Sequence, residues 1–277
     1  MEADVSGAFK LLNVARHAQT LHIELNRPER LNALSKQVLL ELGACLDAAE
    51  SDPQVRAVVI SGAGKAFSSG FDLKEQMERR PEGPEVWREI LDLDFRTTMR
   101  FWHCAKPTIA AIHGACLAGA FELALACDIA VAAEDAYFGE PELKFGAGIV
   151  TMLLPWMVGP KQAKEIILLG LDDIDADTAL RLGLVNRVVP TGEHVSTALR
   201  IATNIAAIDP ALVQETKKAI NRSYEVRGMD TALEAALDID HAIESQGSPD
   251  KKQFMGIARG QGLRAAIAWR DSRFLKG

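Results

Sequence analysis

A single glutamate lies in the middle of a long run of residues that is otherwise almost wholly apolar. The run spans residues 107–128, and Glu122 stands among its Ala, Leu and Phe side chains. Burying a carboxylate there costs several kcal/mol unless the group is paired or stays protonated, so the acid serves a structural contact or chemistry. Gly114 and Gly119 favour chemistry, because they flank a sharp strand-to-helix transition whose helix presents free backbone N–H groups. Donors and an acid on one short segment suit an enzyme that stabilises a developing oxyanion.

The composition of the chain argues against several classes of protein. Its 277 residues are enough for one large domain, or one domain plus an appendage, and 48% hydrophobic with 25% charged residues is ordinary globular usage. The net charge of −7 disfavours nucleic-acid binding, which needs a basic face. His113, Glu122 and Asp128 interrupt the candidate membrane stretch at 107–133, so we expect no membrane insertion.

Cysteine usage and the N-terminus indicate the compartment. Cys45, Cys104, Cys116 and Cys127 show neither a CxxC pair nor the spacing of a zinc site. We therefore expect reduced thiols packed in a core, and no metal site. The first seven residues are acidic and lack an apolar segment, so no targeting peptide is visible and a cytoplasmic protein is expected.

Strand-like and helix-like patterns alternate up to Pro190, and only helical patterns follow. This order predicts an α/β core over residues 1–194 and a helical region over residues 195–277. The expected strands are 20–25, 55–61, 107–112, 129–133 and 184–189. The expected helices are 34–51, 85–103, 121–127, 161–169, 177–182, 195–207, 210–222, 230–244 and 261–269.

Two further segments combine small residues with acids at turns. In the first, Ser68-Ser69-Gly70 separates a strand from a helix whose predicted N-cap is Asp72, and Gly70 permits close approach of a ligand. In the second, Glu142 follows a proline turn and is itself followed by glycines. Taken alone, Glu142 fits an exposed loop charge as well as it fits a functional acid.

Six motifs, taken together and in order, resemble the crotonase superfamily, also called the enoyl-CoA hydratase/isomerase family. The resemblance covers nearly the whole chain, through residues 25–34, 66–74, 106–114, 119–130, 138–142 and 179–189. It implies a spiral of ββα units with a C-terminal helical region that forms homotrimers, often paired into hexamers. It also implies a CoA thioester as the substrate and no separate cofactor.

The resemblance assigns the binding residues. The backbone N–H groups of Phe71 and Gly119 correspond to the oxyanion hole, which binds the thioester carbonyl oxygen and stabilises an enolate. The residues implied to contact CoA are Ala66, Phe67, Ser68, Ser69, Gly70, Asp72, Lys74 and Arg30. For Lys74 an ordinary solvated lysine is an alternative, and for Asp72 the helix cap is the expected role.

The family's two hydratase glutamates correspond to Glu122 and Glu142, twenty positions apart. The resemblance therefore implies syn addition of water to a 2-enoyl-CoA, as in the β-oxidation of fatty acids. Glu122 would deprotonate the water that attacks C3, and Glu142 would deliver a proton to C2. Apolar walls raise the pKa of such acids, which suits proton exchange near neutral pH.

The loop after Glu142 departs from the family pattern. It lacks the proline that precedes the glycines in hydratases and is a few residues short, so we infer an altered acyl pocket lined by Ile149, Met152 and Trp156. Core packing is the alternative for Met152 and Trp156. The departure keeps Δ3-Δ2-enoyl-CoA isomerisation, or hydrolysis or C–C cleavage of an acyl-CoA, open as alternative reactions. An RNA-binding relative without activity is a further alternative, which the acidic balance disfavours.

Other polar residues are expected to be structural. We interpret His113 as a hydrogen-bonded core histidine and Asp128 as a local cap or pair. Glu140 either raises the pKa of Glu142 by like-charge repulsion or faces solvent, and we expect solvent. The charges of the C-terminal helices are expected to be solvated, whereas Trp269, Arg270 and Phe274 are expected to meet a neighbouring subunit or to cover CoA.

Overall fold

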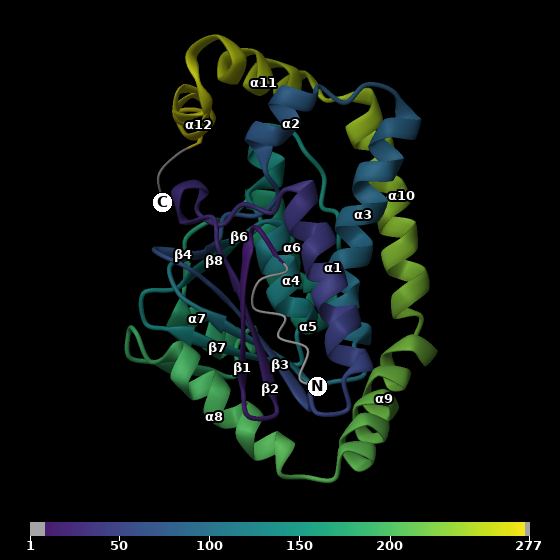
Figure 1. Ribbon diagram of the computed structural model, residues 1–277. Helices are drawn as coiled ribbons and strands as arrows, with labels where there is room; N and C mark the ends of the chain where they lie inside the picture. Colours follow the sequence, from purple (N-terminus) through teal and green to yellow (C-terminus); the bar gives the residue numbers. More distant parts are fainter. Residues whose placement is uncertain (1–8, 275–277) are drawn as a thin grey trace.

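Two β-sheets and a surrounding layer of helices make up the computed structural model, which describes residues 9–274 (Figure 1). The larger sheet has the strand order β1-β2-β3-β5-β7-β10 and is parallel except for the β1–β2 hairpin. Its strands are β1 (Leu12–His17), β2 (Thr20–Leu25), β3 (Ala57–Gly62), β5 (Thr108–Ile112), β7 (Ile129–Ala133) and β10 (Arg187–Val189).

The smaller sheet is built from very short strands in the order β4-β6-β8-β9. They are β4 (Ala66–Ser68), β6 (Ala115–Leu117), β8 (Tyr137–Gly139) and β9 (Ile174–Asp175). Three times in succession the chain places one strand in the larger sheet, the next in the smaller sheet, and then forms a helix. This repeated ββα path brings the ends of β4, β6 and β8 to one place.

The larger sheet is covered on both faces, which is why its central strands are apolar throughout. All residues of β3 and β5 are buried. Alternate residues such as Val59 and Ile109 pack against Ala198 and Ala202 of α8 (His194–Ala206), while Val58 and Ile60 face the main core. The sequence predicted a division into residues 1–194 and 195–277. This boundary falls at the start of α8 and so separates α8 from the strands that it covers. That division remains a prediction.

Most helices before Pro190 contribute residues to the main core on the other face of the sheet. The helices in this part of the chain are α1 (Lys36–Ser51), α2 (Leu73–Arg79), α3 (Pro84–His103), α4 (Gly119–Ala126), α5 (Leu154–Met157), α6 (Pro160–Leu169) and α7 (Ala176–Leu182), with the 3-10 turns η1 (Pro28–Arg30) and η2 (Glu142–Phe145). No helix among residues 9–274 is long and apolar enough to cross a membrane. The four cysteines are free and buried, as expected.

The C-terminal helices fold back over their own chain. They are α9 (Pro210–Val226), α10 (Met229–Gln246), α11 (Pro249–Gln261) and α12 (Leu263–Asp271). Figure 1 shows α10 running beside α3 and α11 lying over α2, while α12 packs on α11 and on η2. Phe254 and Met255 of α11 form an apolar cluster with Phe145 of η2, so the C-terminal helices pack on the segment that follows Glu142.

Most predicted elements are confirmed to within a few residues, but several were missed. The missed elements are β1, β6, β8, β9, α5 and α11. The strands β6, β8 and β9 have two or three residues and are too short to display a period, whereas β1 has six residues and was overlooked. Gly256 and Gly260 weaken the helical signal of α11. Ser248 caps α11 by accepting a hydrogen bond from the Lys251 N–H, with Pro249 in the first turn.

Some expectations about charged residues were wrong. Asp240, Glu244 and Lys251 of the C-terminal helices are buried rather than solvated. Trp269 packs on the cluster around Phe145, and Arg270 forms an ion pair with Asp172 at 3.1 Å. The proposed contact of these last residues with a neighbouring subunit stays a prediction.

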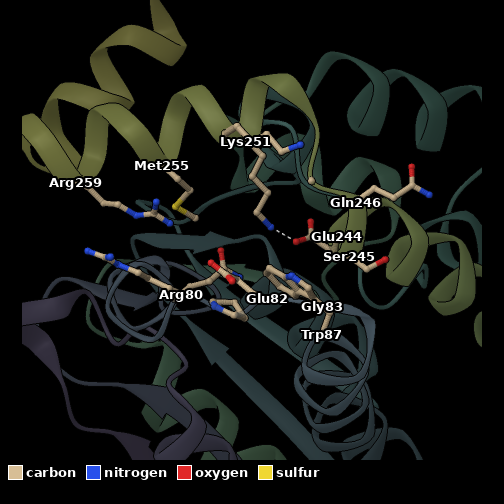
Figure 2. A pocket seen from close by; sticks show the side chains of 14 residues that line it. Arg80, Glu82, Gly83, Trp87, Glu244, Ser245, Gln246, Lys251, Met255 and Arg259 are labelled. Atoms are coloured by element: carbon tan, nitrogen blue, oxygen red, sulfur yellow. Dashed lines mark hydrogen bonds and ion pairs between the residues drawn. The ribbon is translucent and has the colours of Figure 1, made fainter.

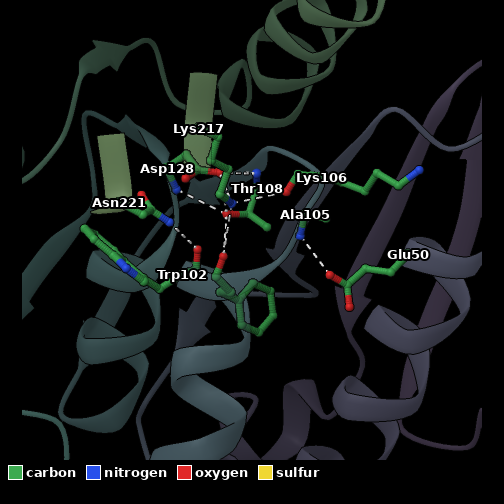
Figure 3. A network of polar contacts seen from close by, with 9 residues as sticks. Glu50, Trp102, Ala105, Lys106, Thr108, Asp128, Lys217 and Asn221 are labelled. Atoms are coloured by element: carbon green, nitrogen blue, oxygen red, sulfur yellow. Dashed lines mark hydrogen bonds and ion pairs between the residues drawn. The ribbon is translucent and has the colours of Figure 1, made fainter. Parts of the chain in front are cut away.

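Asp128 forms a long-range ion pair instead of the expected local one (Figure 3). Its Oδ2 accepts hydrogen bonds from Lys217 Nζ of α9 at 2.6 Å and from the Thr108 N–H at 2.7 Å. Lys217 also donates to the Lys106 carbonyl, and the nearby Asn221 amide donates to the Trp102 carbonyl at 2.9 Å. This network fastens α9 to the strand that carries the apolar run.

Substituting Lys217 by Met should destabilise the protein by about 1–3 kcal/mol, because it leaves the Asp128 carboxylate, whose side chain is 22% exposed, without its cation. The matched control is Lys218→Met on the same helix, whose side chain is 77% exposed and whose loss should change stability by less than about 0.5 kcal/mol. Urea unfolding of both variants measures the difference. Equal destabilisation by the two substitutions would contradict this role of the pair.

Candidate active site

Two loops meet where β4 and β6 end. Gly70 has a φ of +88°, and a Cβ built on it would lie 2.7 Å from the Ala118 Cβ, so only glycine allows this approach. Ala118 has a φ of +56° and a ψ of −137°, a strained conformation for alanine, and its N–H donates to the Gly139 carbonyl at 2.8 Å. This bend turns the chain from β6 into α4 and sets Gly119 at the start of the helix.

The bend and the loop leave two backbone donors without partners. The Leu34 N–H donates to the Gly70 carbonyl, and the Asp72 N–H donates to the Leu34 carbonyl, so the Phe71 N–H points away from Leu34. Gly119 occupies the first turn of α4, where no intrahelical acceptor exists. Within residues 9–274, neither N–H donates to a turn, loop or cap acceptor. The Phe71 ring covers Gly119, which brings the two segments together.

Glu122 lies one turn into α4 and is completely buried, as its apolar neighbours predict. Its Oε1 accepts a hydrogen bond from the Thr151 N–H at 3.0 Å, and its Oε2 has no partner within the described chain. Burial raises the pKa of Glu122 to about 8, although the Thr151 hydrogen bonds lower it. The acid can therefore both accept and release a proton near neutral pH.

Glu142 and Glu140 complete a cluster of three buried carboxyls. Oxygen atoms of Glu122, Glu140 and Glu142 lie within 4.8 Å of one another, and the Oε2 of each has no hydrogen-bond partner in the described chain. Burial, followed by like-charge repulsion, raises the pKa of Glu140 well above its ordinary value. Burial and the neighbouring Glu122 do the same for Glu142.

The expectation that Glu140 faces solvent was wrong, because the residue is 1% exposed. The Glu140 N–H donates to the Leu171 carbonyl at 2.8 Å, which holds the end of β8 against the segment before β9. A Cβ on Gly139 would collide with Leu171, so the chain is held close there. No local pattern around Glu140 signals this pairing, because its partner lies far along the sequence.

Two acids that the sequence analysis did not single out lie near the cluster. Asp94 of α3 and Asp240 of α10 are buried, and burial is the main cause that raises the pKa of each, to about 6 for Asp240. Glu122 further raises the pKa of Asp94, and Asp240 further raises that of Glu122. Asp94 interrupts the apolar stripe of its helix, which is the kind of signal that identified Glu122.

An apolar cluster adjoins the two free donors. Trp87 and Leu91 of α3 pack with Val150 and with Leu237 of α10, and Phe71 packs against them. Ile149, Met152 and Trp156, the predicted acyl-pocket residues, pack instead in or against the main core. Phe71 packs against both clusters, so the acyl-pocket role of Ile149, Met152 and Trp156 stays a prediction.

The residues predicted to contact CoA differ in their exposure to solvent. Ala66, Phe67 and Ser68 form β4 and are buried, and the Ser68 hydroxyl donates to the Asn32 carbonyl at 2.8 Å. Asp72 caps α2, as expected, by accepting from the Lys74 and Glu75 N–H groups, and it pairs with Arg27 at 2.9 Å. The two predicted charged contacts, Lys74 and Arg30, are exposed. Ser69 and Gly70 lie on the loop between β4 and α2. Their contact with CoA stays a prediction.

His113 has the structural role that we expected. Its Nε2 lies 3.1 Å from the Gly64 carbonyl oxygen, and its ring stacks on His194 with centroids 4.7 Å apart. Burial lowers the pKa of His194 to about 4, so that ring stays neutral. No nucleophilic side chain contacts His113 among the described hydrogen bonds.

Known proteins share this arrangement. A family model for enoyl-CoA hydratase/isomerase matches residues 15–259. A crystal structure of an enoyl-CoA hydratase/isomerase from Xanthobacter autotrophicus Py2 superimposes with a TM-score of 0.96 at 61% identity, covering 97% of this chain and all of that one. The short-chain-enoyl-CoA hydratase of Clostridium acetobutylicum is 38% identical over 84% of this chain and 88% of its own length.

A relative with a different reaction is almost as similar. The mitochondrial Δ3,5-Δ2,4-dienoyl-CoA isomerase of Homo sapiens is 38% identical over 76% of this chain and 67% of its own length. The chain belongs to the enoyl-CoA hydratase/isomerase family and has the crotonase fold that its six motifs predict. The protein is an enzyme of this family, and the family acts on acyl-CoA thioesters.

The free energy of unfolding should fall as the pH rises from about 4.5 to about 8, because Glu122 ionises in the unfolded chain before it ionises in the folded one. Stability contributed by the protonated acid is present below pH 4.5 and is lost as the pH approaches 8. Glu122→Gln should reduce this decline by up to about 1.4 kcal/mol per pH unit. Glu165→Gln, an exposed acid on α6, is the control for denaturant unfolding across this range. Identical pH slopes for wild type and Glu122→Gln would contradict the expectation.

Proposed function

We propose that this enzyme adds water to 2-enoyl-CoA thioesters and forms 3-hydroxyacyl-CoA. The observation that carries the proposal is the pair of buried glutamates, Glu122 and Glu142, each with an unpaired carboxyl oxygen. They come from the segments that follow β6 and β8, beside the free N–H groups of Phe71 and Gly119. The hydratase relative from Clostridium acetobutylicum supports the same reaction.

In the proposed reaction, the thioester carbonyl accepts hydrogen bonds from the Phe71 and Gly119 N–H groups. These donors stabilise the negative charge that develops on the oxygen when water attacks C3. The N-terminus of α4 adds a favourable dipole at the same place. Removing one such donor costs about 2.7–4 kcal/mol of transition-state stabilisation in enzymes that have been tested.

The two acids divide the proton transfers. Glu122, as the carboxylate, accepts a proton from the attacking water, and Glu142, as the acid, donates a proton to C2. The raised pKa values of both groups keep a proton within the pair near neutral pH. A proton passed from Glu122 to Glu142 then restores the starting state, so no outside acid is consumed.

Migration of a double bond is the second candidate reaction. The observation that favours it is Glu140, a third buried carboxyl within 4.8 Å of the other two, which gives the site one more proton carrier than a water addition uses. The dienoyl-CoA isomerase relative supports this alternative. An isomerase needs only a proton removed at one carbon and returned at another, without incorporation of water.

The deciding experiment measures loss of enone absorbance with crotonyl-CoA and with 2-octenoyl-CoA, and identifies the products by mass spectrometry. Hydration adds one water to the product, whereas isomerisation leaves the mass unchanged. We expect hydration by the wild type, and a decrease in kcat of at least about 100-fold in both Glu122→Gln and Glu142→Gln. Glu140→Gln should reduce kcat by less than either.

The outcomes separate the two reactions. Hydration that survives both substitutions would contradict the two-glutamate mechanism. Products of unchanged mass from 3-enoyl- or dienoyl-CoA, with no hydration of either 2-enoyl substrate, would replace hydratase by isomerase. Loss of activity in Glu140→Gln alone would assign the main proton transfers to the third acid.

Activity should be unchanged after dialysis against EDTA, because the proposed mechanism uses protonated and ionised carboxyls rather than a cation. The glutamate cluster has the oxygen ligands that Mg²⁺ and Mn²⁺ prefer, so the dialysis can distinguish catalysis by the carboxyls alone from catalysis by a bound cation. Activity that is lost on dialysis and restored by one of these ions would contradict the proposal. Metal analysis of the purified protein provides the second measurement.

A further inference from the structure

A charged pocket lies beyond the apolar cluster, where the loop between α2 and α3 meets the junction of α10 and α11 (Figure 2). Its volume is about 350 Å³. The side chains that matter for its chemistry are Arg80, Trp87, Glu244, Lys251, Met255 and Arg259. None of them belongs to the glutamate cluster or to the oxyanion hole.

The pocket has an excess of positive charge. Four basic residues line it, namely Arg80, Lys251, Lys252 and Arg259, against the two acids Glu82 and Glu244. Four positive and two negative charges give the lining of this partly apolar cavity a net charge of +2. A ligand that enters this space is favoured if it carries a negative charge.

One of the four cations is already paired. Lys251 forms a buried ion pair with Glu244, and its Nζ lies 4.3 Å from the centre of the Trp87 ring. Burial lowers the pKa of Lys251 to about 8, while Asp240 raises it. The ammonium group is therefore held in the inner wall of the pocket by its two acids and its aromatic neighbour.

The two arginines are available to a ligand. Within residues 9–274, neither Arg80 nor Arg259 forms an ion pair with an acid. Figure 2 shows Arg259 extending from α11 and Arg80 from the end of α2 toward the same side of the pocket. Guanidinium groups bind carboxylates through paired hydrogen bonds.

The pocket shares a wall with the apolar cluster beside the two free donors. Trp87 belongs both to the pocket and to the apolar cluster that includes Val150 and reaches Phe71. Glu244, in the pocket wall, accepts a hydrogen bond from the Gly148 N–H at 3.3 Å, two residues before Val150. The apolar cluster therefore extends from Phe71 at one end to the pocket at the other.

We propose that the pocket binds a carboxylate at the far end of the acyl chain, so that the preferred substrates are CoA thioesters of dicarboxylic acids. The proposal rests on the proposed function, which orients the thioester at Phe71 and Gly119. Trp87 and Met255 contact the last methylene groups, and Arg80 and Arg259 bind the carboxylate. An uncharged chain of the same length places a methyl group between two guanidinium groups and gains no such contact.

Binding of saturated thioesters to the full-length protein tests the proposal without any turnover. Isothermal titration compares hexanoyl- with adipoyl-CoA, octanoyl- with suberoyl-CoA, and decanoyl- with sebacoyl-CoA, so that each pair differs only at the end of the tail. We expect the diacid to bind about ten-fold more tightly at one or more lengths, the gain that a charge-assisted hydrogen bond provides.

Substitutions then identify the residues responsible. Arg80→Met and Arg259→Met should each abolish most of the preference for the diacid, while hexanoyl-CoA binding stays within about two-fold of wild type. Arg264→Met, an exposed residue of α12 outside the pocket, is the matched control and should keep the full preference. All three are surface substitutions, so folding should be preserved.

Three results would overturn the proposal. In the first, the diacid thioester binds no more tightly than its uncharged partner at any length. In the second, the preference for the diacid survives both Arg80→Met and Arg259→Met; in the third, these variants lose equal affinity for the charged and the uncharged tails. The last result would assign the arginines to a phosphate of CoA, since all six ligands share that group. If the diacid preference holds but the matching 2-enoyl thioesters are not hydrated, only the hydratase proposal fails.

Discussion

The central constraint on the candidate active site is that three carboxyl groups are buried together with no cation paired to them within the described chain. Glu122, Glu140 and Glu142 are each at most 7% exposed, and no ion pair within residues 9–274 neutralises any of them. Such a cluster is tolerable only if protons replace cations, because several ionised carboxylates this close together in a dry site would repel one another strongly. Burial therefore sets the protonation state, and the protonation state makes an exchange of protons near neutral pH possible.

The two sheets give the acids their positions relative to the backbone donors. Each ββα turn ends a short strand at the same edge, so Phe71, Gly119 and Glu142 are brought together from segments far apart in the sequence. The cost is the strained backbone at Ala118, a non-glycine residue with a φ of +56°. Strain of this kind persists because the close contact with Gly70 and the hydrogen bond to the Gly139 carbonyl hold the bend on both sides.

The sequence could predict the parts of the site whose cause is local. Glu122 lies in an apolar run, so its burial follows from its immediate neighbours. Glu140 was misjudged because its burial depends on pairing with Leu171, which no local pattern contains. The buried charges Asp240 and Lys251 were missed although they continue buried stripes: Asp240 follows Leu237 by three residues on α10, and Lys251 precedes Phe254 and Met255 by three and four residues on α11. The expectation that every charge of these helices is solvated was wrong because it did not test the spacing of the charges against the apolar residues.

The glutamate cluster and the charged far pocket are built from different segments of the chain. Glu122 is held by the Thr151 N–H and by α4, whereas the far pocket is built from α10, α11 and the loop that contains Arg80. Within the far pocket Lys251 is paired with Glu244, whereas Arg80 and Arg259 form no ion pair within residues 9–274. A cation beside Glu122 would lower its pKa and weaken it as a base. In the proposed reaction, positive charge at the far pocket would attract an anionic tail without lowering the pKa of the glutamates.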